Sequence, residues 1–455
     1  MVWAYVQSLD LSSLDAQVRS VEGHAGRPSI DRRLLLGLWL YATLDGVGSA
    51  REIERLCVEH LAYMWLCGDV SVGRVLLAEF RVSQEALLDE LLAKSVGSLR
   101  AEGLVTLERV AQDGLRVRAS AGAGSFRRRD RLAAALEEAR AQVAALKAEL
   151  DADPGAADRR RQAAQLRGAE DRARRLQQAI AQMPSIERAW EKNQRKRGTR
   201  GKGGRGGASP AEDAHRAASQ PLEGAGLPPA SAAGTVEPVA TAEERSAPPL
   251  PLAPSPDATR APRGSSTDPD ARVMKMPNSG FRPAFNCQFA AEVDTLVVVG
   301  VGLTNVGSDQ GLHTEMLAHV ERTHGVRPKE WLVDGGFPTL VSIDAMPDDC
   351  LLFAPVLKPR GSGRDPFAPM RGDSPKVAGW RQRMGTAQAK ETYKKRASTI
   401  ECLNAHVRNR GLRQMPVRGQ QKCRSILLLH ALAHNLLRAG ALRRQRAANT
   451  AAAAA

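Results

Sequence analysis

The first hundred residues carry apolar side chains at helical spacing, separated by short polar stretches. One apolar face covers residues 34–41, and the sequence S-A-R-E from Ser49 is typical of a capped helix start. Further apolar faces cover residues 60–67 and 84–96. Short helices with short connections predict an all-α N-terminal domain over residues 1–100.

Beyond residue 100 the pattern changes to the alternation that is typical of strands. Residues 106–117 alternate apolar and polar positions around the dipeptide Asp113-Gly114, which predicts a strand that ends at a turn near Asp113. F-N-C-Q-F-A-A-E-V-D and T-L-V-V-V-G-V-G-L predict two strands joined at Asp294, and W-L-V-D-G-G-F predicts a short strand that ends at Asp334.

Another buried strand and three helices complete this pattern. The strand is expected at 350–356 and the helices at 309–322, 393–409 and 423–437. Together these segments predict an α/β domain with a mixed sheet and flanking helices, built from residues 101–125 and 267–440.

An insertion separates the two parts of this domain. Heptad-like apolar spacing over 126–183, broken by D-A-D-P-G-A-A, predicts an antiparallel coiled-coil hairpin, and the alternative is one solvated helix kinked at Pro154. Residues 184–266 are basic, Gly-rich and then Pro-rich, so we expect a disordered linker there. The basic tract over 195–205 has either non-specific DNA affinity or no role beyond that of a linker. We also expect a disordered Ala-rich tail over 441–455.

Charge and composition narrow the class of partner. The 455 residues include 65 Lys and Arg against 50 Asp and Glu, a formal net charge of +15, which favours a polyanionic partner. The longest apolar runs are shorter than the ~18 residues of a membrane span, so no membrane partner is expected. The first residues lack a signal-peptide pattern and the cysteines are scattered, which favours a cytoplasmic protein with reduced cysteines.

Three carboxylates stand out as candidate chemistry. Asp113 and Asp334 each follow an apolar strand and precede a glycine, and Glu401 lies on a helix with Arg396 and Arg408. Converging carboxylates need a cation between them, and oxygen ligands suit Mg²⁺ or Mn²⁺. Two such ions about 4 Å apart are the usual arrangement for phosphodiester chemistry. Asp-Gly is also a common turn dipeptide, so a plain turn role for either Asp stays open from spacing alone.

Tyr393, Arg396, Glu401 and Arg408 have the spacing Tyr-x2-Arg-x4-Glu-x6-Arg. With this spacing the chain resembles one known family, the DDE transposases of bacterial insertion sequences, whose signature is Tyr-x2-Arg-(x3 or x4)-Glu-x6-Lys. D-G-L-R-V-R-A-S is similar to the family's D-G-T-K-h-K-A-N segment, and V-D-G-G-F to its A-D-A-G-Y segment. The helical N-terminal segment, T-D-P-D-A-R-V-M-K and T-N-V-G-S-D are similar to family segments as well.

The resemblance implies an RNase H-like catalytic domain in which Asp113, Asp334 and Glu401 are the catalytic residues and hold two Mg²⁺ or Mn²⁺ ions. Tyr393, Lys394, Lys395, Arg396 and Arg408 would then contact DNA phosphates. The implied activity is binding of the element's terminal inverted repeats, strand cleavage and strand transfer into target DNA. We expect a homodimer on DNA, associated with the bacterial nucleoid. Two alternatives stay open: an RNase H-like nuclease or resolvase, and a catalytically decayed DNA-binding protein.

Overall fold

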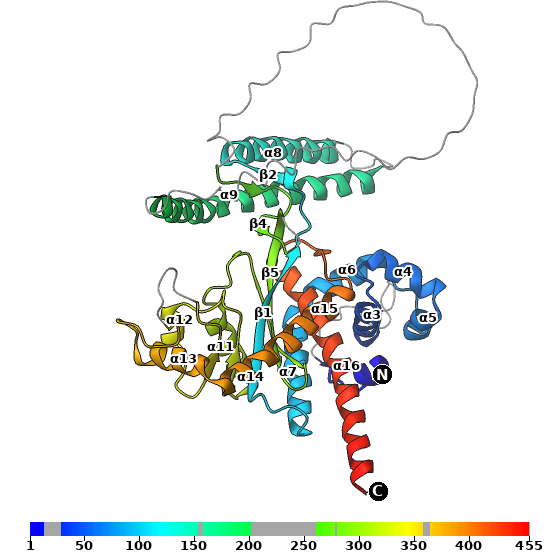
Figure 1. Cartoon of the computed structure of the whole chain (residues 1–455). Coiled ribbons are helices and arrows are strands. Elements are labelled where there is room, and N and C mark those ends of the chain that lie inside the picture. The colour runs from blue at the N-terminus through cyan, green and yellow to red at the C-terminus, as the bar shows by residue number, and fades with distance from the viewer. Residues whose placement is uncertain (13–28, 153–157, 202–260, 278–279, 358–364, 455) are drawn as a thin grey trace, which may run out of the picture.

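The N-terminal part of the protein is a group of short helices (Figure 1). The computed structural model describes residues 1–12, 29–152, 158–201, 261–277, 280–357 and 365–454, with the backbone alone for 196–201. Its first helices are α1 (Val2–Gln7), α3 (Arg32–Leu44), α4 (Ala50–Glu59), α5 (Leu61–Cys67), α6 (Arg74–Ser83) and α7 (Glu85–Ala101). The side chain of Ser49 caps α4 by accepting from the Glu52 N–H. The expected helices over 34–41, 60–67 and 84–96 are confirmed.

The N-terminal helices share one hydrophobic core with the rest of the protein. The last helix, α16 (Gln420–Ala454), packs against α3, α6, α7 and strand β6. Within the part of the chain that the structure describes, α16 is the one helix that is long and apolar enough to cross a membrane. Because 72% of the apolar 18-residue segment of α16 is buried inside the protein, α16 is a core helix here.

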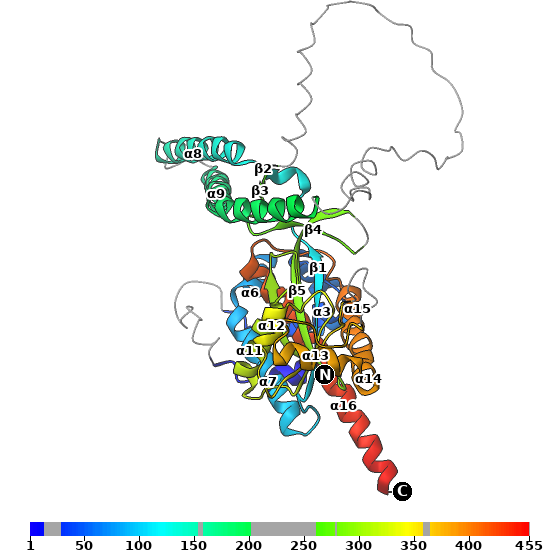
Figure 2. The same ribbon diagram turned by 60° about the vertical axis from the view of Figure 1, so that its left-hand side comes forward.

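A mixed sheet of six strands forms the centre of the second part (Figures 1 and 2). Its order is β4, β5, β1, β7 and β8, with β6 paired to β5. The central strand β1 is antiparallel to β5 and parallel to β7, and β7 is parallel to β8. The strands are β1 (Arg109–Arg118), β4 (Arg272–Lys275), β5 (Phe281–Glu292), β6 (Val298–Thr304), β7 (Glu330–Leu332) and β8 (Leu351–Phe353). The expected mixed α/β architecture is confirmed.

Helices cover the sheet. Helix α11 packs on β6 and α13 on β8, whereas a π-helical turn over Ala397–Glu401 packs on β1 and β5. The bounds are α11 (Leu312–His324), α12 (Leu340–Asp344), α13 (Pro375–Gly385), α14 (Ala387–Arg396) and α15 (Cys402–Asn409). The expected helices over 309–322, 393–409 and 423–437 are thus present.

The turn predicted at Asp113 is wrong. Strand β1 continues through Asp113 and Gly114 to Arg118, because β5 pairs with it from Val110 to Arg118 without interruption. The glycine is explained by a close approach instead. A Cβ on Gly114 would lie 2.4 Å from Asp309 Oδ1 and 2.6 Å from Gln288 Nε2, so no larger residue fits without a shift.

The insertion is a helical hairpin at one end of the sheet, and both views place it beyond the end of β1 (Figures 1 and 2). A two-stranded ladder of β2 (Phe126–Arg127) and β3 (Gly264–Ser265) closes its base. Helices α8 (Arg129–Ala152) and α9 (Arg159–Gly201) run antiparallel, as the ion pairs Arg129–Glu187 (2.7 Å) and Lys147–Glu170 (3.1 Å) require. They share a core of their own: Leu132, Ala135, Leu136, Ala139, Leu176, Ala179 and Met183. The single solvated helix is therefore wrong, while supercoiling of the hairpin stays a prediction.

The prediction of disorder is partly wrong for two segments. Helix α9 continues through Pro184 to Gly201, because Met183 and Ile186 pack onto the hairpin core on either side of the proline. Residues 202–260 of the expected linker lie outside the described residues. The tail expected over 441–455 is helical as far as Ala454, since alanine favours helix and Arg443 is anchored to Glu102 at 2.6 Å.

Candidate active site

Asp113 and Asp334 occupy matching positions on neighbouring parallel strands. The register of β1 and β7 pairs Ala111 with Leu332, and each Asp lies two residues further along its strand direction. Strand β7 itself ends at Leu332, so Asp334 lies just beyond its carboxyl end and is exposed. The Asp334 carboxylate accepts a hydrogen bond from the Gly335 N–H at 2.7 Å, which fixes its orientation. The fold thus brings two of the three predicted carboxylates together.

Glu401 comes from a helix that packs over the same strands. Helices α14 and α15 are joined through the π-helical turn Ala397–Glu401. In an α-helix, residues five apart point in different directions, because each residue turns about 100°. The π turn absorbs the additional residue of the Arg-x4-Glu spacing, so that Arg396 and Glu401 face one another.

Arg396 links two of the carboxylates. Its guanidinium lies 3.3 Å from Asp113 Oδ1 and 3.9 Å from Glu401 Oε1. The Arg396 side chain is nine-tenths buried, whereas the Glu401 side chain is 66% exposed. The second Asp113 oxygen accepts from Asn404 Nδ2 at 3.1 Å. Asp113 is thus held by two side chains of the helical segment that carries Glu401.

Burial and neighbouring carboxylates raise the pKa values of Asp113 and Tyr393. Burial raises the pKa of Asp113, the Arg396 charge opposes this, and the charges of Asp309 and Asp334 raise the pKa further. Burial also raises the pKa of Tyr393, and the charges of Asp334, Asp113 and Glu401 add to it. The charges of all three predicted carboxylates thus contribute to the raised pKa of Tyr393.

The donor chemistry fits a divalent cation. Asp113, Asp334 and Glu401 offer hard oxygens, and burial, together with the charges of Asp309 and Asp334, raises the pKa of Asp113. Asn404 Oδ1 is also buried without a hydrogen-bond partner beside Asp113. Among the described residues, no three His, Cys, Asp or Glu side chains are gathered closely enough to hold an ion. Arg396 provides the positive charge between Asp113 and Glu401 in this arrangement.

The other predicted residues lie around this centre. Tyr393 is half-buried, and Lys394, Lys395 and Arg408 are exposed. Lys394 pairs with Glu391 at 2.5 Å and Lys395 with Asp294 at 3.3 Å. These cations are accessible to a polyanion that approaches Glu401, whereas Arg396 is turned inward to the carboxylates.

Sequence reasoning missed a polar network behind Asp113. Arg116 pairs with Asp309 at 2.8 Å, and Asn286 and Gln288 donate to Asp309 Oδ1 at 2.7 and 2.8 Å. Asp309 is therefore held by an ion pair beneath the sheet, beside Gly114. Asn286 and Gln288 alternate along β5, a spacing that places both on one face and could have revealed the network. Asn404 was missed as well, although it follows Glu401 by three residues on one helix face.

Comparisons with known proteins match two segments of the chain. A family model described as "Transposase domain (DUF772)" matches residues 2–81, the N-terminal helices. A model described as "Transposase DDE domain" matches residues 374–439, which include Tyr393, Arg396 and Glu401. The strands that carry Asp113 and Asp334 lie outside both matches. No curated protein and no solved structure matches the chain significantly.

Proposed function

Because the chain is a DDE-type transposase, as its two family matches show, we propose that it binds the terminal inverted repeats of its insertion sequence and catalyses metal-dependent strand cleavage and strand transfer. The DDE match also implies an RNase H-like fold for the sheet. DDE transposases use divalent metal ions, and we propose two Mg²⁺ or Mn²⁺ ions here.

One observation carries the proposal. The register of β1 and β7 aligns Asp113 with Asp334, and Arg396 connects Asp113 to Glu401 on the helix that the DDE family model matches. Arg396 thus connects Asp113 to Glu401, and Asp334 follows the strand that neighbours the strand of Asp113, whereas an isolated turn role for each Asp would leave them unrelated. This supports Asp113, Asp334 and Glu401 as the metal ligands.

Each group of residues would have its own role in the reaction. Asp113, Asp334 and Glu401 would hold the ions, which lower the pKa of an attacking water and stabilise the departing oxygen. Asn404 would orient Asp113 through its hydrogen bond. Tyr393, Lys394, Lys395 and Arg408 would contact backbone phosphates, which fixes the position of the DNA without reading its sequence. Arg396 would exchange its contact with the carboxylates for a phosphate when DNA and metal bind.

The remaining parts would recognise the element and assemble on it. The N-terminal helices are the proposed module for the transposon ends, since they match a transposase domain and share a core with the catalytic sheet. We further propose a homodimer on DNA, with the insertion hairpin as a candidate contact, in the bacterial cytoplasm at the nucleoid.

A strand-transfer assay tests the proposed function. The purified protein is incubated with a labelled duplex that ends in the element's terminal repeat and with a supercoiled target plasmid, with Mg²⁺ or with EDTA. We expect Mg²⁺-dependent nicking at the repeat and labelled plasmid. Cleavage without label transfer would favour a nuclease or resolvase, and repeat binding without cleavage would favour a decayed DNA-binding protein.

A further inference from the structure

A groove lies where the insertion hairpin meets the rest of the protein. Its volume is about 680 Å³, and three segments far apart in the sequence line it: α6, the middle of α9, and residues 416–422, which include the start of α16. Ser120, two residues beyond β1, lines it as well. The hairpin thus forms one wall of a groove whose other walls belong to the N-terminal helices and the catalytic part.

Cations dominate the lining. Five positive side chains face two negative ones: Arg81, Arg174, Arg175, Arg418 and Lys422 against Asp171 and Asp270. Asp171 is occupied by Arg174 at 2.6 Å and by Arg175 of its own helix. The Asp270 carboxylate accepts from Gln182 at 2.5 Å and from the Gln420 N–H at 2.9 Å. The acidic groups therefore leave a positive excess in the groove.

The cations on opposite walls repel one another. Arg175 and Arg418 line the groove from segments far apart in the sequence. Burial lowers the pKa of Arg175, and the positive charge of Arg418 lowers it further. Arg175 Nε is buried without a hydrogen-bond partner. Arg418 Nε is satisfied by the Ser120 carbonyl at 3.4 Å. An anion between the walls would relieve this repulsion.

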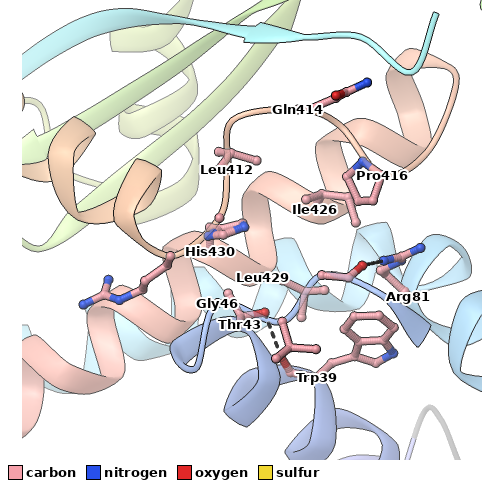
Figure 3. A pocket seen from close by; sticks show the side chains of 14 residues that line it. Trp39, Thr43, Gly46, Arg81, Leu412, Gln414, Pro416, Ile426, Leu429 and His430 are labelled. Atoms are coloured by element: carbon pink, nitrogen blue, oxygen red, sulfur yellow. Dashed lines mark hydrogen bonds between the residues drawn. The ribbon is translucent and has the colours of Figure 1, made fainter. Parts of the chain in front are cut away.

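Arg81 lines both the groove and a smaller pocket of about 70 Å³, which Figure 3 shows. Its guanidinium lies 4.6 Å from the Trp39 ring centroid and donates to the Gly48 carbonyl at 2.5 Å. Figure 3 shows Arg81 between Trp39 and Pro416. The side chain is 7% exposed, and its Nε has no hydrogen-bond partner. The structure thus holds a fixed, partly unsatisfied cation at the edge of the groove.

We propose that this groove binds the sugar–phosphate backbone of DNA, so that the insertion hairpin is a DNA-contacting element. Arg174, Arg418 and Lys422 are exposed along an open groove and do not close around one point. Such an arrangement fits a row of phosphates better than a single small anion. The inference rests on the proposed function and adds to it a second contact surface, whose lining does not include Glu401.

The same duplex would reach the groove and the carboxylates. Ser120 is seven residues beyond Asp113, so the two are at most about 24 Å apart at ~3.4 Å per residue. That separation corresponds to about seven base pairs at ~3.4 Å each. We therefore expect the hairpin to protect DNA within about seven base pairs of the cleaved phosphate.

The test compares two double variants of the full-length protein. In the groove variant, Arg174→Glu is combined with Lys422→Glu. In the control, Arg172→Glu is combined with Arg140→Glu, which are exposed on the same hairpin and pair with Glu138 and Glu137 outside the groove. Affinity for a duplex with the terminal repeat, and for an unrelated duplex of equal length, is measured against salt concentration. Circular dichroism verifies that both variants fold.

For the groove variant we expect a shallower dependence of log affinity on log salt concentration. The magnitude of the negative slope should decrease by about two on both duplexes, one for each lost phosphate contact. The control should keep the wild-type slope. If the wild type binds and the groove variant keeps its slope, the groove proposal is overturned while the proposed function stands. A wild-type protein that binds neither duplex would overturn both.

Discussion

At the scale of single residues, Gly114 is determined by its neighbours across the sheet. The side chains of Asp309, Gln288 and Asn286 all lie within 2.8 Å of the position that a Cβ would occupy. These are the groups that form the polar network behind Asp113. The dipeptide Asp113-Gly114 therefore combines a candidate catalytic carboxylate with a residue that leaves room for the polar network around Asp309.

Replacing Gly114 by alanine should lower the free energy of unfolding by about 1–3 kcal/mol, because the methyl group forces the network to move. Chemical denaturation measures this change. Gly97→Ala is the matched control, since Gly97 lies in helix α7 with open space around its Cβ position. That control should stabilise the protein by up to about 1 kcal/mol. Equal stability of Gly114→Ala and wild type would contradict the packing argument.

Asp268 should make stability depend on pH. It is fully buried, and burial raises its pKa to about 6, although the Gly419 N–H donates to it. Since the folded pKa exceeds the unfolded value near 4, the carboxyl contributes stability below about pH 4 that is lost as the pH rises through about 6. Asp268→Asn removes this loss, so above pH 7 the variant should be more stable than wild type by up to roughly 3 kcal/mol.

Denaturation curves between pH 4 and pH 8 test this. The exposed Asp348→Asn should follow the wild-type curve. A constant difference between Asp268→Asn and wild type at every pH would show that the Asp268 carboxyl does not titrate in this range.

At the scale of elements, periodic patterns predicted helices and strands well where burial is regular. The buried strands β5 and β6 and the apolar faces of α3, α7 and α16 are examples. Predictions from local sequence preferences were wrong where contacts between segments far apart in the sequence determine the backbone structure. Asp113-Gly114 is a turn dipeptide in isolation, yet pairing with β5 keeps it in a strand. Proline ends many helices, yet α9 continues through Pro184 because residues on both sides of it pack in the hairpin core.

The candidate site was predictable in composition but not in geometry. The order of Asp113, Asp334 and Glu401 could be recognised from sequence, whereas the juxtaposition of the two aspartates follows from the register of β1 and β7. The partner of Arg396 depends on the π turn, which no periodic pattern indicates. Long-range strand pairing and irregular helix geometry thus determine the relative positions of the site residues, which sequence patterns do not predict.

The π turn offers a prediction of its own. Deleting Ser398 should convert Ala397–Glu401 to a regular α-helix, in which Arg396 and Glu401 become four apart and still share a face. We expect Mg²⁺-dependent cleavage to survive this deletion. Inserting an alanine after Ser398 separates the two by six residues, turns Glu401 away and should abolish cleavage. Loss of cleavage in the deletion variant, with folding intact, would contradict this role of the turn.

At the scale of the whole molecule, the net charge of +15 has a structural location. Exposed cations lie on the helices that flank Glu401, at Lys394, Lys395 and Arg408, and others line the groove beside the hairpin. The N-terminal helices and the sheet share one core, so end recognition and catalysis would occur on one body, with the hairpin as an appended element that has its own core.

The measurement that tests the central claim most directly is Mg²⁺-dependent cleavage of a duplex with the terminal repeat by Asp113→Asn, Asp334→Asn and Glu401→Gln. Glu391→Gln, an exposed change on α14, is the control. If the three carboxylates form one site, each variant should bind the duplex but cleave it at no more than about a thousandth of the wild-type rate. The control should cleave at the wild-type rate. Cleavage near the wild-type rate by any of the three variants would contradict the account.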